Sequence, residues 1–274
     1  MWRAYALRRA TLADLSAEDG RSARQVQRVI RAEAGRNPAV VRVADRTPVV
    51  LVLDTSYFGA FGVMVFRCAT RRQNLHWTFV GEETNGAYLA GIARLREAGL
   101  DVVAAVCDGK RWLAEQIQAL DVPVQLCQFH FLKTMTRHLT RHPRMEAGSE
   151  LRSLALGAKR LGGAAFTAAL ETWRVRHESF LAEKTVAPST GRWRYTHRDV
   201  RAAYRTALRW LPNLFTYEKF PALGIPNTTN TLEGTFSHLK RKVNVHRGLN
   251  DETKRKMISL ILNQPCLPKR KKTN

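Results

Sequence analysis

Three carboxylate residues stand where metal chemistry could be carried out. Asp54 follows the apolar run 49–53, Asp108 follows a second apolar run, 102–107, and Glu233 stands at the start of a helical pattern. Acids that end buried strands are held rigidly where a sheet meets water, and Mg²⁺ binds carboxylate oxygens while it keeps several of its waters. We therefore predict that the three side chains converge to hold two divalent cations, Mg²⁺ with Mn²⁺ as its substitute, for phosphodiester chemistry.

Each acid also has a simpler interpretation. An aspartate at a strand end can be a turn residue, and Glu233 can be an exposed side chain near the positive end of a helix. The apolar strands that precede both aspartates favour the metal site for the set. Glu218 is the alternative third acid, but no polar cap or basic helix frames it. Lys240 and Arg241 follow Glu233 by about two turns on a similar helix face and are expected to contact phosphates.

The composition indicates a nucleic acid as partner. Lys and Arg number 45 against 23 Asp and Glu, and the resulting net charge of +22 attracts polyanions. Arg192 and Arg194 alternate with Trp193 and Tyr195, a pattern that can stack on exposed bases or form the core of a helical bundle. The apolar runs are shorter than the roughly 20 residues that span a bilayer. No signal-peptide pattern and no CxxC pair is present, so we expect a cytoplasmic protein without membrane association.

The elements that must position the acids follow an α/β order. We predict strands over 49–53, 61–66, 75–80, 102–107 and 122–127, with helices over 85–98 and 110–120. Short turns between the first three strands favour antiparallel pairing, and the alternation of strands and helices afterwards favours parallel pairing. This is the order of an RNase H-like fold, a mixed five-stranded sheet with helices on both faces. In that fold the first strand lies beside the fourth, so Asp54 and Asp108 would be neighbours.

The predicted core is interrupted by a long helical segment. Residues 48–130 form its first part, 131–225 an arginine-rich, all-helical insertion without strand-like runs, and 226–263 its last helices. Residues 35–47 read as a linker, and 264–274 as a basic tail.

The first 34 residues predict a helix-turn-helix module. A helical run, a turn with Gly20 and a second helix with capping-box spacing follow one another. In this interpretation the second helix enters the major groove of DNA and presents Ser22, Arg24, Gln25 and Arg28. The alternative is a helical hairpin that packs on the next domain.

The pair Cys127 and His130 follows the last predicted strand. This spacing can contribute to a zinc site, but four ligands are needed, and the further candidates His138, His142 and Cys107 have no familiar spacing. We therefore expect no structural zinc. His130 is expected instead to support the active site by hydrogen bonding to a carboxylate or a phosphate oxygen. The alternative is a buried cysteine and a capping histidine at a helix start.

Taken together, these motifs resemble the Mutator-type insertion-sequence transposases, bacterial DDE enzymes related to plant Mutator-like elements. The resemblance rests on the residues around both aspartates, the Cys127–His130 pair, which looks like the family's C(2)H signature, and the segment Asn230-Thr231-Leu232-Glu233-Gly234. A long helical insertion before the third acid is also a family trait. Some relatives carry a cysteine-rich zinc ribbon at the N-terminus that is absent here, so the chain is expected to be a short or truncated member.

The resemblance implies an enzyme that binds the terminal inverted repeats of its element, cleaves DNA there and transfers the strand to target DNA. It implies Asp54 as the ligand shared by both metal ions, Asp108 and Glu233 as the ligand of one each, and a homo-oligomer, at least a dimer, on DNA. The location implied is the bacterial cytoplasm, on the nucleoid. Two alternatives stay open: an RNase H-like nuclease or resolvase without strand transfer, and a non-catalytic DNA-binding regulator derived from a transposase.

Overall fold

The computed structural model describes residues 1–8, 10–34, 48–110, 112–246 and 248–264. The chain divides into two compact units, one made of Met1–Val102 with Asn230–Asn274 and the other of Val103–Thr229. The predicted linker over 35–47 and all but the first residue of the predicted basic tail lie outside the described residues. No helix in the described ranges is long and apolar enough to cross a membrane.

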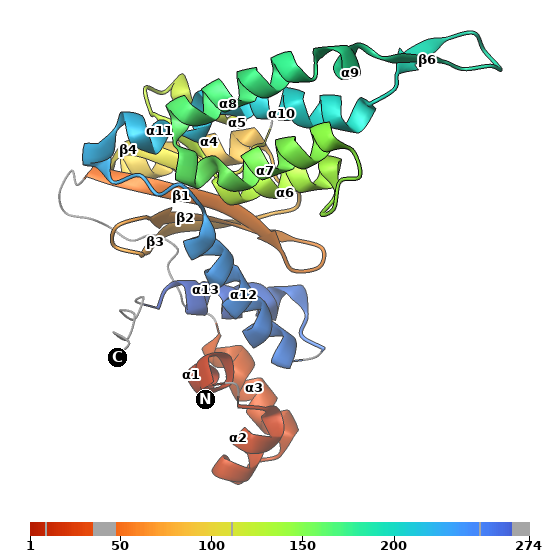
Figure 1. The fold of residues 1–274 in the computed structure, drawn as a ribbon. Helices are drawn as coiled ribbons and strands as arrows, with labels where there is room; N and C mark the ends of the chain where they lie inside the picture. The colour runs from red at the N-terminus through yellow and green to blue at the C-terminus, as the bar shows by residue number, and fades with distance from the viewer. Residues whose placement is uncertain (9, 35–47, 111, 247, 265–274) are drawn as a thin grey trace, which may run out of the picture. The chain divides into compact units, whose positions relative to one another are not determined.

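A five-stranded mixed sheet is the centre of the fold, as predicted. Its strands are β1 (Pro48–Tyr57), β2 (Gly62–Cys68), β3 (Asn74–Val80), β4 (Asp101–Cys107) and β5 (Val124–Leu126), in the order β3-β2-β1-β4-β5 (Figure 1). β1 pairs antiparallel with β2, and β2 with β3, whereas β4 and β5 are parallel. The predicted α/β class, the five strands and the place of the first strand beside the fourth are confirmed.

Strand β1 is longer than its apolar run. The run 49–53 is buried throughout, but pairing with β2 continues as far as Tyr57 opposite Gly62. Asp54 therefore lies within the strand, opposite Val65, and the prediction that it ends the strand is wrong. The reason is that backbone pairing depends on the neighbouring strand, whereas an apolar run shows only where both faces of a strand are covered.

In the first unit, helices cover both faces of the antiparallel strands. α4 (Asn85–Glu97) packs on one face, where a Cβ on Gly91 would lie 1.9 Å from the ring of Phe66. On the opposite face lie α12 (Asn230–Val245) and α13 (Asp251–Leu262). Arg67 donates to the Thr235 hydroxyl of α12 over 3.4 Å, and Trp77 Nε1 to Ser259 of α13 over 3.2 Å. Helices on both faces of the sheet were predicted, and the contacts of β2 and β3 with these helices confirm the prediction for this part of the sheet.

Three helices precede the sheet: α1 (Trp2–Arg8), α2 (Leu12–Asp19) and α3 (Ala23–Glu33). Thr11 and Ser22 cap α2 and α3 in complete capping boxes. Gly20, with φ of 70°, ends α2 in the left-handed conformation that glycine adopts easily. The two capped helices and the glycine turn match the predicted layout, while their use as a DNA-binding motif stays a prediction.

Helix α1 ties these helices to α12 within the same unit. The Tyr5 ring lies 4.0 Å from the His246 ring, measured between centroids, and the ammonium of the buried Lys242 donates to the Leu7 carbonyl over 2.5 Å. Within the helical group, the backbone N–H of Trp2 in α1 donates to the carboxylate of Glu33 in α3 over 2.7 Å. A buried ammonium with a carbonyl acceptor avoids most of the free energy that an unpaired one would cost.

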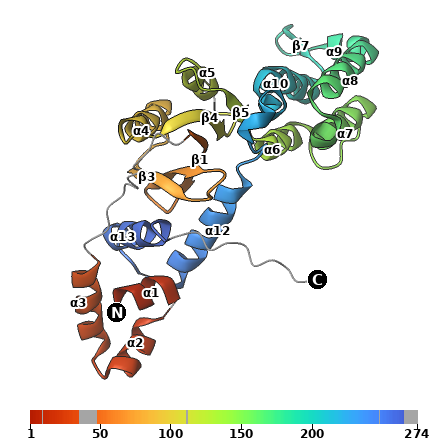
Figure 2. The ribbon, with the colours of Figure 1, turned by 90° about the vertical axis from the view of Figure 1, so that its left-hand side faces the viewer.

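The second unit is mainly helical. Besides the end of the sheet it contains α5 (Leu113–Gln118), α6 (Gln128–Leu139), α7 (Glu146–Leu161), α8 (Gly163–Arg176), α9 (Glu178–Ala182), α10 (Arg198–Leu214), α11 (Thr216–Lys219) and a 3-10 helix, η1 (Pro221–Leu223). Figure 2 shows α6, α7, α8 and α10 packed side by side. The amide of the buried Gln125 in β5 donates to the Leu214 carbonyl over 2.8 Å and so holds the end of α10 to the sheet.

The segment 131–225 is not all-helical. β6 (Lys184–Val186) and β7 (Trp193–Tyr195) form an antiparallel hairpin beyond α9, visible in Figure 1 at the end of the helical group. The prediction that no strands occur here is wrong. Two runs of three residues are too short to show an alternating pattern, and their pairing depends on the loop over 187–192 that joins them.

Candidate active site

Asp54 stands on a defined face of the sheet. Residues directly opposite each other on paired strands share a face, and Asp54, Val65 and Trp77 form one such row across β1, β2 and β3. Trp77 bonds to Ser259 of α13, so the row faces α12 and α13. The Asp54 carboxylate is half-buried, and its Oδ1 accepts the Thr55 N–H over 2.8 Å. The side chain is thus held at a helix-covered face with partial access to solvent.

Glu233 lies in the first turn of α12, as predicted. The helix buries Leu232, Phe236 and Leu239, and Glu233, next to this apolar stripe, is half-buried. α12 packs against β1. Asp54 and Glu233 therefore belong to one unit and to the same side of its sheet, although they are far apart along the chain.

Asp108 directly follows β4 in the second unit, so here the prediction of an acid at a strand end is confirmed. It is half-buried, and its Oδ1 accepts the Lys110 N–H over 3.1 Å. Gly109 follows because no larger residue fits: a Cβ would lie 1.8 Å from Cζ2 of Trp210. Trp210, on α10, is itself buried. The helical segment that was predicted as an insertion therefore packs directly on the backbone beside this acid.

The other candidate acid, Glu218, has a structural contact. Its exposed carboxylate accepts the Gly163 N–H at the start of α8 over 2.9 Å. A carboxylate at a helix N-terminus stabilises the helix through this bond and through the dipole. This contact accounts for Glu218 without a role as the third metal-binding acid.

Cys127 begins α6 and holds the segment that leads into α12. Its Sγ accepts hydrogen bonds from the backbone N–H and the hydroxyl of the buried Thr229, over 3.3 and 3.4 Å. Burial, the largest single influence, raises the pKa of the Cys127 thiol, but hydrogen bonds with His130 and Thr229 together lower it below its ordinary value. The Gln128 N–H also donates to the Asn227 carbonyl over 2.9 Å. The start of α6, with Cys127 of the pair that was predicted to support the active site, thus holds residues 227–229 in place. A hydrogen bond from His130 to a carboxylate or a phosphate oxygen stays a prediction.

Within the described ranges, no group of three or more His, Cys, Asp or Glu side chains is placed to hold a metal ion. Of the further zinc candidates, Cys107 is buried in β4 and His142 is exposed. His138 Nε2 lies 3.4 Å from the Thr206 hydroxyl.

The predicted DNA-contacting residues lie at three places. On α3, Ser22 and Gln25 satisfy each other in the capping box, whereas Arg24 and Arg28 are exposed. Lys240 and Arg241 are exposed on α12, and Lys240 Nζ lies 5.9 Å from the centre of the Phe58 ring. Arg192 and Arg194 are exposed at the hairpin: Arg194 lies within β7 and Arg192 just before it.

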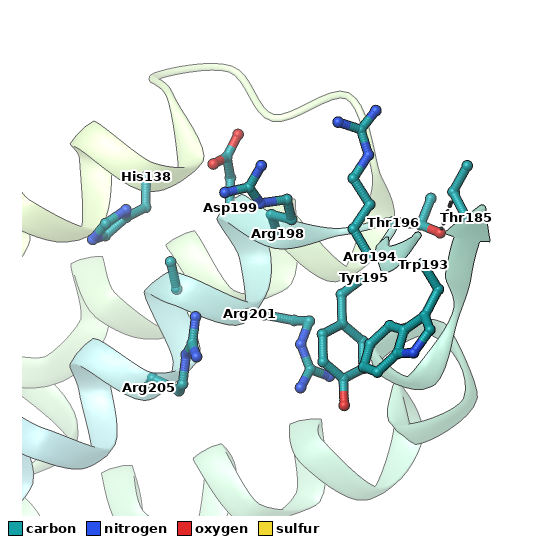
Figure 3. A pocket seen from close by; sticks show the side chains of 11 residues that line it. His138, Thr185, Trp193, Arg194, Tyr195, Thr196, Arg198, Asp199, Arg201 and Arg205 are labelled. Carbon is teal, nitrogen blue, oxygen red and sulfur yellow. Dashed lines mark hydrogen bonds between the residues drawn. The ribbon is translucent and has the colours of Figure 1, made fainter. Parts of the chain in front are cut away.

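The structure adds three arginines that the sequence interpretation did not single out. Arg198, Arg201 and Arg205 lie along the first half of α10, beside the hairpin (Figure 3). Their spacing of three and four residues, which puts side chains on one side of a helix, was the available signal.

Comparison with known proteins identifies no family. No protein-family model matches the chain, and no curated protein matches it. Among solved structures, a cryo-EM structure of the simian T-cell lymphotropic virus intasome in complex with PP2A regulatory subunit B56 gamma is similar over 64% of this chain and 68% of the viral structure's chain, with 10% identity and a TM-score of 0.26. A likeness at this TM-score assigns neither family nor function.

Proposed function

We propose that the protein is a transposase that catalyses metal-dependent DNA strand cleavage and strand transfer through Asp54, Asp108 and Glu233, on an RNase H-like core. The observation that carries the proposal is the strand register that puts Asp54 on the face of the sheet where α12 packs, with Glu233 in the first turn of that helix. Asp108 follows β4, the neighbour of β1 in the strand order. This order supports its assignment to the same site.

The three side chains fit Mg²⁺ by their chemistry. All are carboxylates, the hard oxygen donors that this ion prefers, and all are half-buried, so that hydrated ions can reach them. Asp54 would be the shared ligand, and Asp108 and Glu233 would hold one ion each. When bound, Mg²⁺ or Mn²⁺ supplies Lewis-acid stabilisation of the charge that develops at a phosphodiester.

Exposed basic residues on two helices would bind and orient DNA. Lys240 and Arg241 lie on α12 beyond Glu233, where their charges can neutralise phosphates of a strand at the site. On α3, Arg24 and Arg28 are exposed and are our candidates for contacts to duplex DNA at the terminal inverted repeats. The net charge of +22 favours binding along the whole polymer by counterion release. Because two DNA ends must be joined to target DNA, we propose a homo-oligomer, at least a dimer, on DNA.

The test compares each acid with a matched substitution elsewhere. Asp54→Asn, Asp108→Asn and Glu233→Gln remove a charge with little change in shape. Asp101→Asn, at the exposed start of β4, and Glu218→Gln are the controls. Labelled duplexes made from the DNA that flanks the gene would be incubated with the full chain in Mg²⁺ or Mn²⁺. We expect no cleavage by the first three variants and unchanged cleavage by the two controls.

Binding and joining are measured separately. The duplexes should bind all five variants equally in EDTA, since the loss concerns chemistry and not affinity. Cleavage retained by any of the first three variants would remove that residue from the site. Products that are cut but never joined to a target plasmid would show a nuclease in place of a transposase. Binding without cutting in either metal would show a regulator.

A further inference from the structure

A basic groove lies in the second unit, between the β6–β7 hairpin and the first half of α10. Its volume is about 1020 Å³. Figure 3 shows its lining, which includes His138, Trp193, Arg194, Arg198, Arg201 and Arg205. All of these residues belong to the second unit. None of the three proposed catalytic acids lines the groove.

The groove is strongly positive. Four arginines line it, and Asp199 is the one acidic residue in its lining. His138 stands at the edge of the groove. Burial is the largest cause that lowers the pKa of His138. The cation Arg137 lowers it next, Asp199 raises it, and Arg209 and Arg205 lower it by less. The arginines are therefore the dominant charges that a ligand meets in the groove.

An aromatic side chain stands open at the hairpin. Trp193 is 56% exposed, with Lys184 Nζ 4.3 Å from the centre of its ring. The ring of Tyr195 is covered by the guanidinium of Arg201 at 3.5 Å. A two-stranded hairpin has little stability of its own. Trp193 is thus a large apolar surface that stays more than half exposed beside a row of arginines.

We propose that this groove binds a single strand of nucleic acid, with its phosphates along Arg198 and Arg205 and an unpaired base stacked on Trp193. Arginines three and four residues apart lie on one side of α10 and can follow a backbone. A base has an open face for stacking only when its strand is unpaired or distorted. An acidic protein would match the arginines but would leave the indole unused. The inference rests on the proposed function only in taking DNA as the polymer.

The first test separates stacking from charge. The full chain is titrated in EDTA, by fluorescence anisotropy, with an intact duplex and with the same duplex carrying a short single-stranded gap. The wild type should bind the gapped DNA more tightly, and Trp193→Ala should lose about tenfold of that preference, because one base–aromatic stack contributes on this order. Trp193→Phe, which keeps an aromatic ring, should retain most of it. Affinity for the intact duplex should change little in either variant.

The second test counts phosphate contacts. Arg205→Gln should reduce the slope of log affinity against log salt for single-stranded DNA by about 0.7, as expected for the loss of one contact. Arg160→Gln removes the same charge from the exposed end of α7 and is the matched control, with an unchanged slope.

Two results would overturn the inference: equal slopes for Arg205→Gln and Arg160→Gln, or a gap preference that survives Trp193→Ala. Competition by polyglutamate together with the second result would show an acidic protein surface as the ligand. Loss of intact-duplex binding or of cleavage concerns the proposed function, and it is measured independently of the gap preference.

Discussion

The substitution Gly109→Ala tests how the helical segment positions Asp108. A Cβ at this position would lie 1.8, 2.3 and 2.5 Å from three atoms of the Trp210 ring, far inside ordinary contact. Gly109 does not have a left-handed backbone, so the penalty is purely steric. Trp210 has little freedom to withdraw, because it is 3% exposed and its ring packs 5.7 Å from that of Phe131.

Overpacking of this kind costs about 1–3 kcal/mol, occasionally more. Since the ring must retreat by an ångström or more against Phe131, we expect a loss at the upper end, about 3 kcal/mol. For a chain of this size each kcal/mol lowers the melting temperature by about 2–4 °C, so the shift should be about 6–12 °C. The displaced backbone should also reduce DNA cleavage, because Asp108 is the preceding residue.

Thermal and urea unfolding followed by circular dichroism would measure the change. Gly234→Ala is the matched control: it lies within α12, and a Cβ there meets nothing within 4 Å. Alanine in place of glycine inside a helix stabilises by about 0.5–1 kcal/mol, so the same substitution should have the opposite sign. In a Trp210→Phe background, which removes the clashing ring atoms, Gly109→Ala should cost at least about 1 kcal/mol less.

A Gly109→Ala variant as stable as the wild type would refute this reasoning. So would an equal penalty in the two backgrounds, because the loss would then have another origin than the tryptophan ring.

Three further predictions concern the second unit and the proposed metal. The hydrogen bond with His177 holds the pKa of Glu150 below its ordinary value. Its stabilisation is therefore present above the ordinary carboxyl pKa of about 4.3 and lost as the pH falls through the lowered value. The difference in urea midpoint between wild type and Glu150→Gln should accordingly shrink in acid, and a constant difference would contradict it. Thr229→Val removes the hydroxyl bonded to the Cys127 thiol and should cost about 0.5–1.5 kcal/mol in urea unfolding, while Thr229→Ser keeps the bond and most of the stability. EDTA should stop DNA cleavage and leave binding unchanged, with activity restored by Mg²⁺ or Mn²⁺; cleavage in EDTA would rule out the metal-dependent mechanism.

The sequence predicted local elements well where one pattern decided them. The apolar runs located every strand of the five-stranded sheet, and the capping-box spacing that begins at Ser22 gave the start of α3. Strand length was misjudged at Asp54, because pairing with β2 extends β1 past its apolar run. The β6–β7 hairpin was missed, because three-residue strands carry too little pattern.

The candidate site shows the same contrast between what a local pattern predicts and what contacts between distant residues decide. Residue type and position along the chain were sufficient to choose Asp54, Asp108 and Glu233 and the arginines of α3, since charge and element order are properties of the sequence. Only the tertiary structure decided which face of the sheet Asp54 occupies, why Gly109 must be glycine, and that Glu218 caps α8. It also brought Trp193 and the arginines of α10 into one groove. Those outcomes depend on contacts between residues far apart in the chain, and a local pattern carries no information about which distant side chain will fill the space beside it.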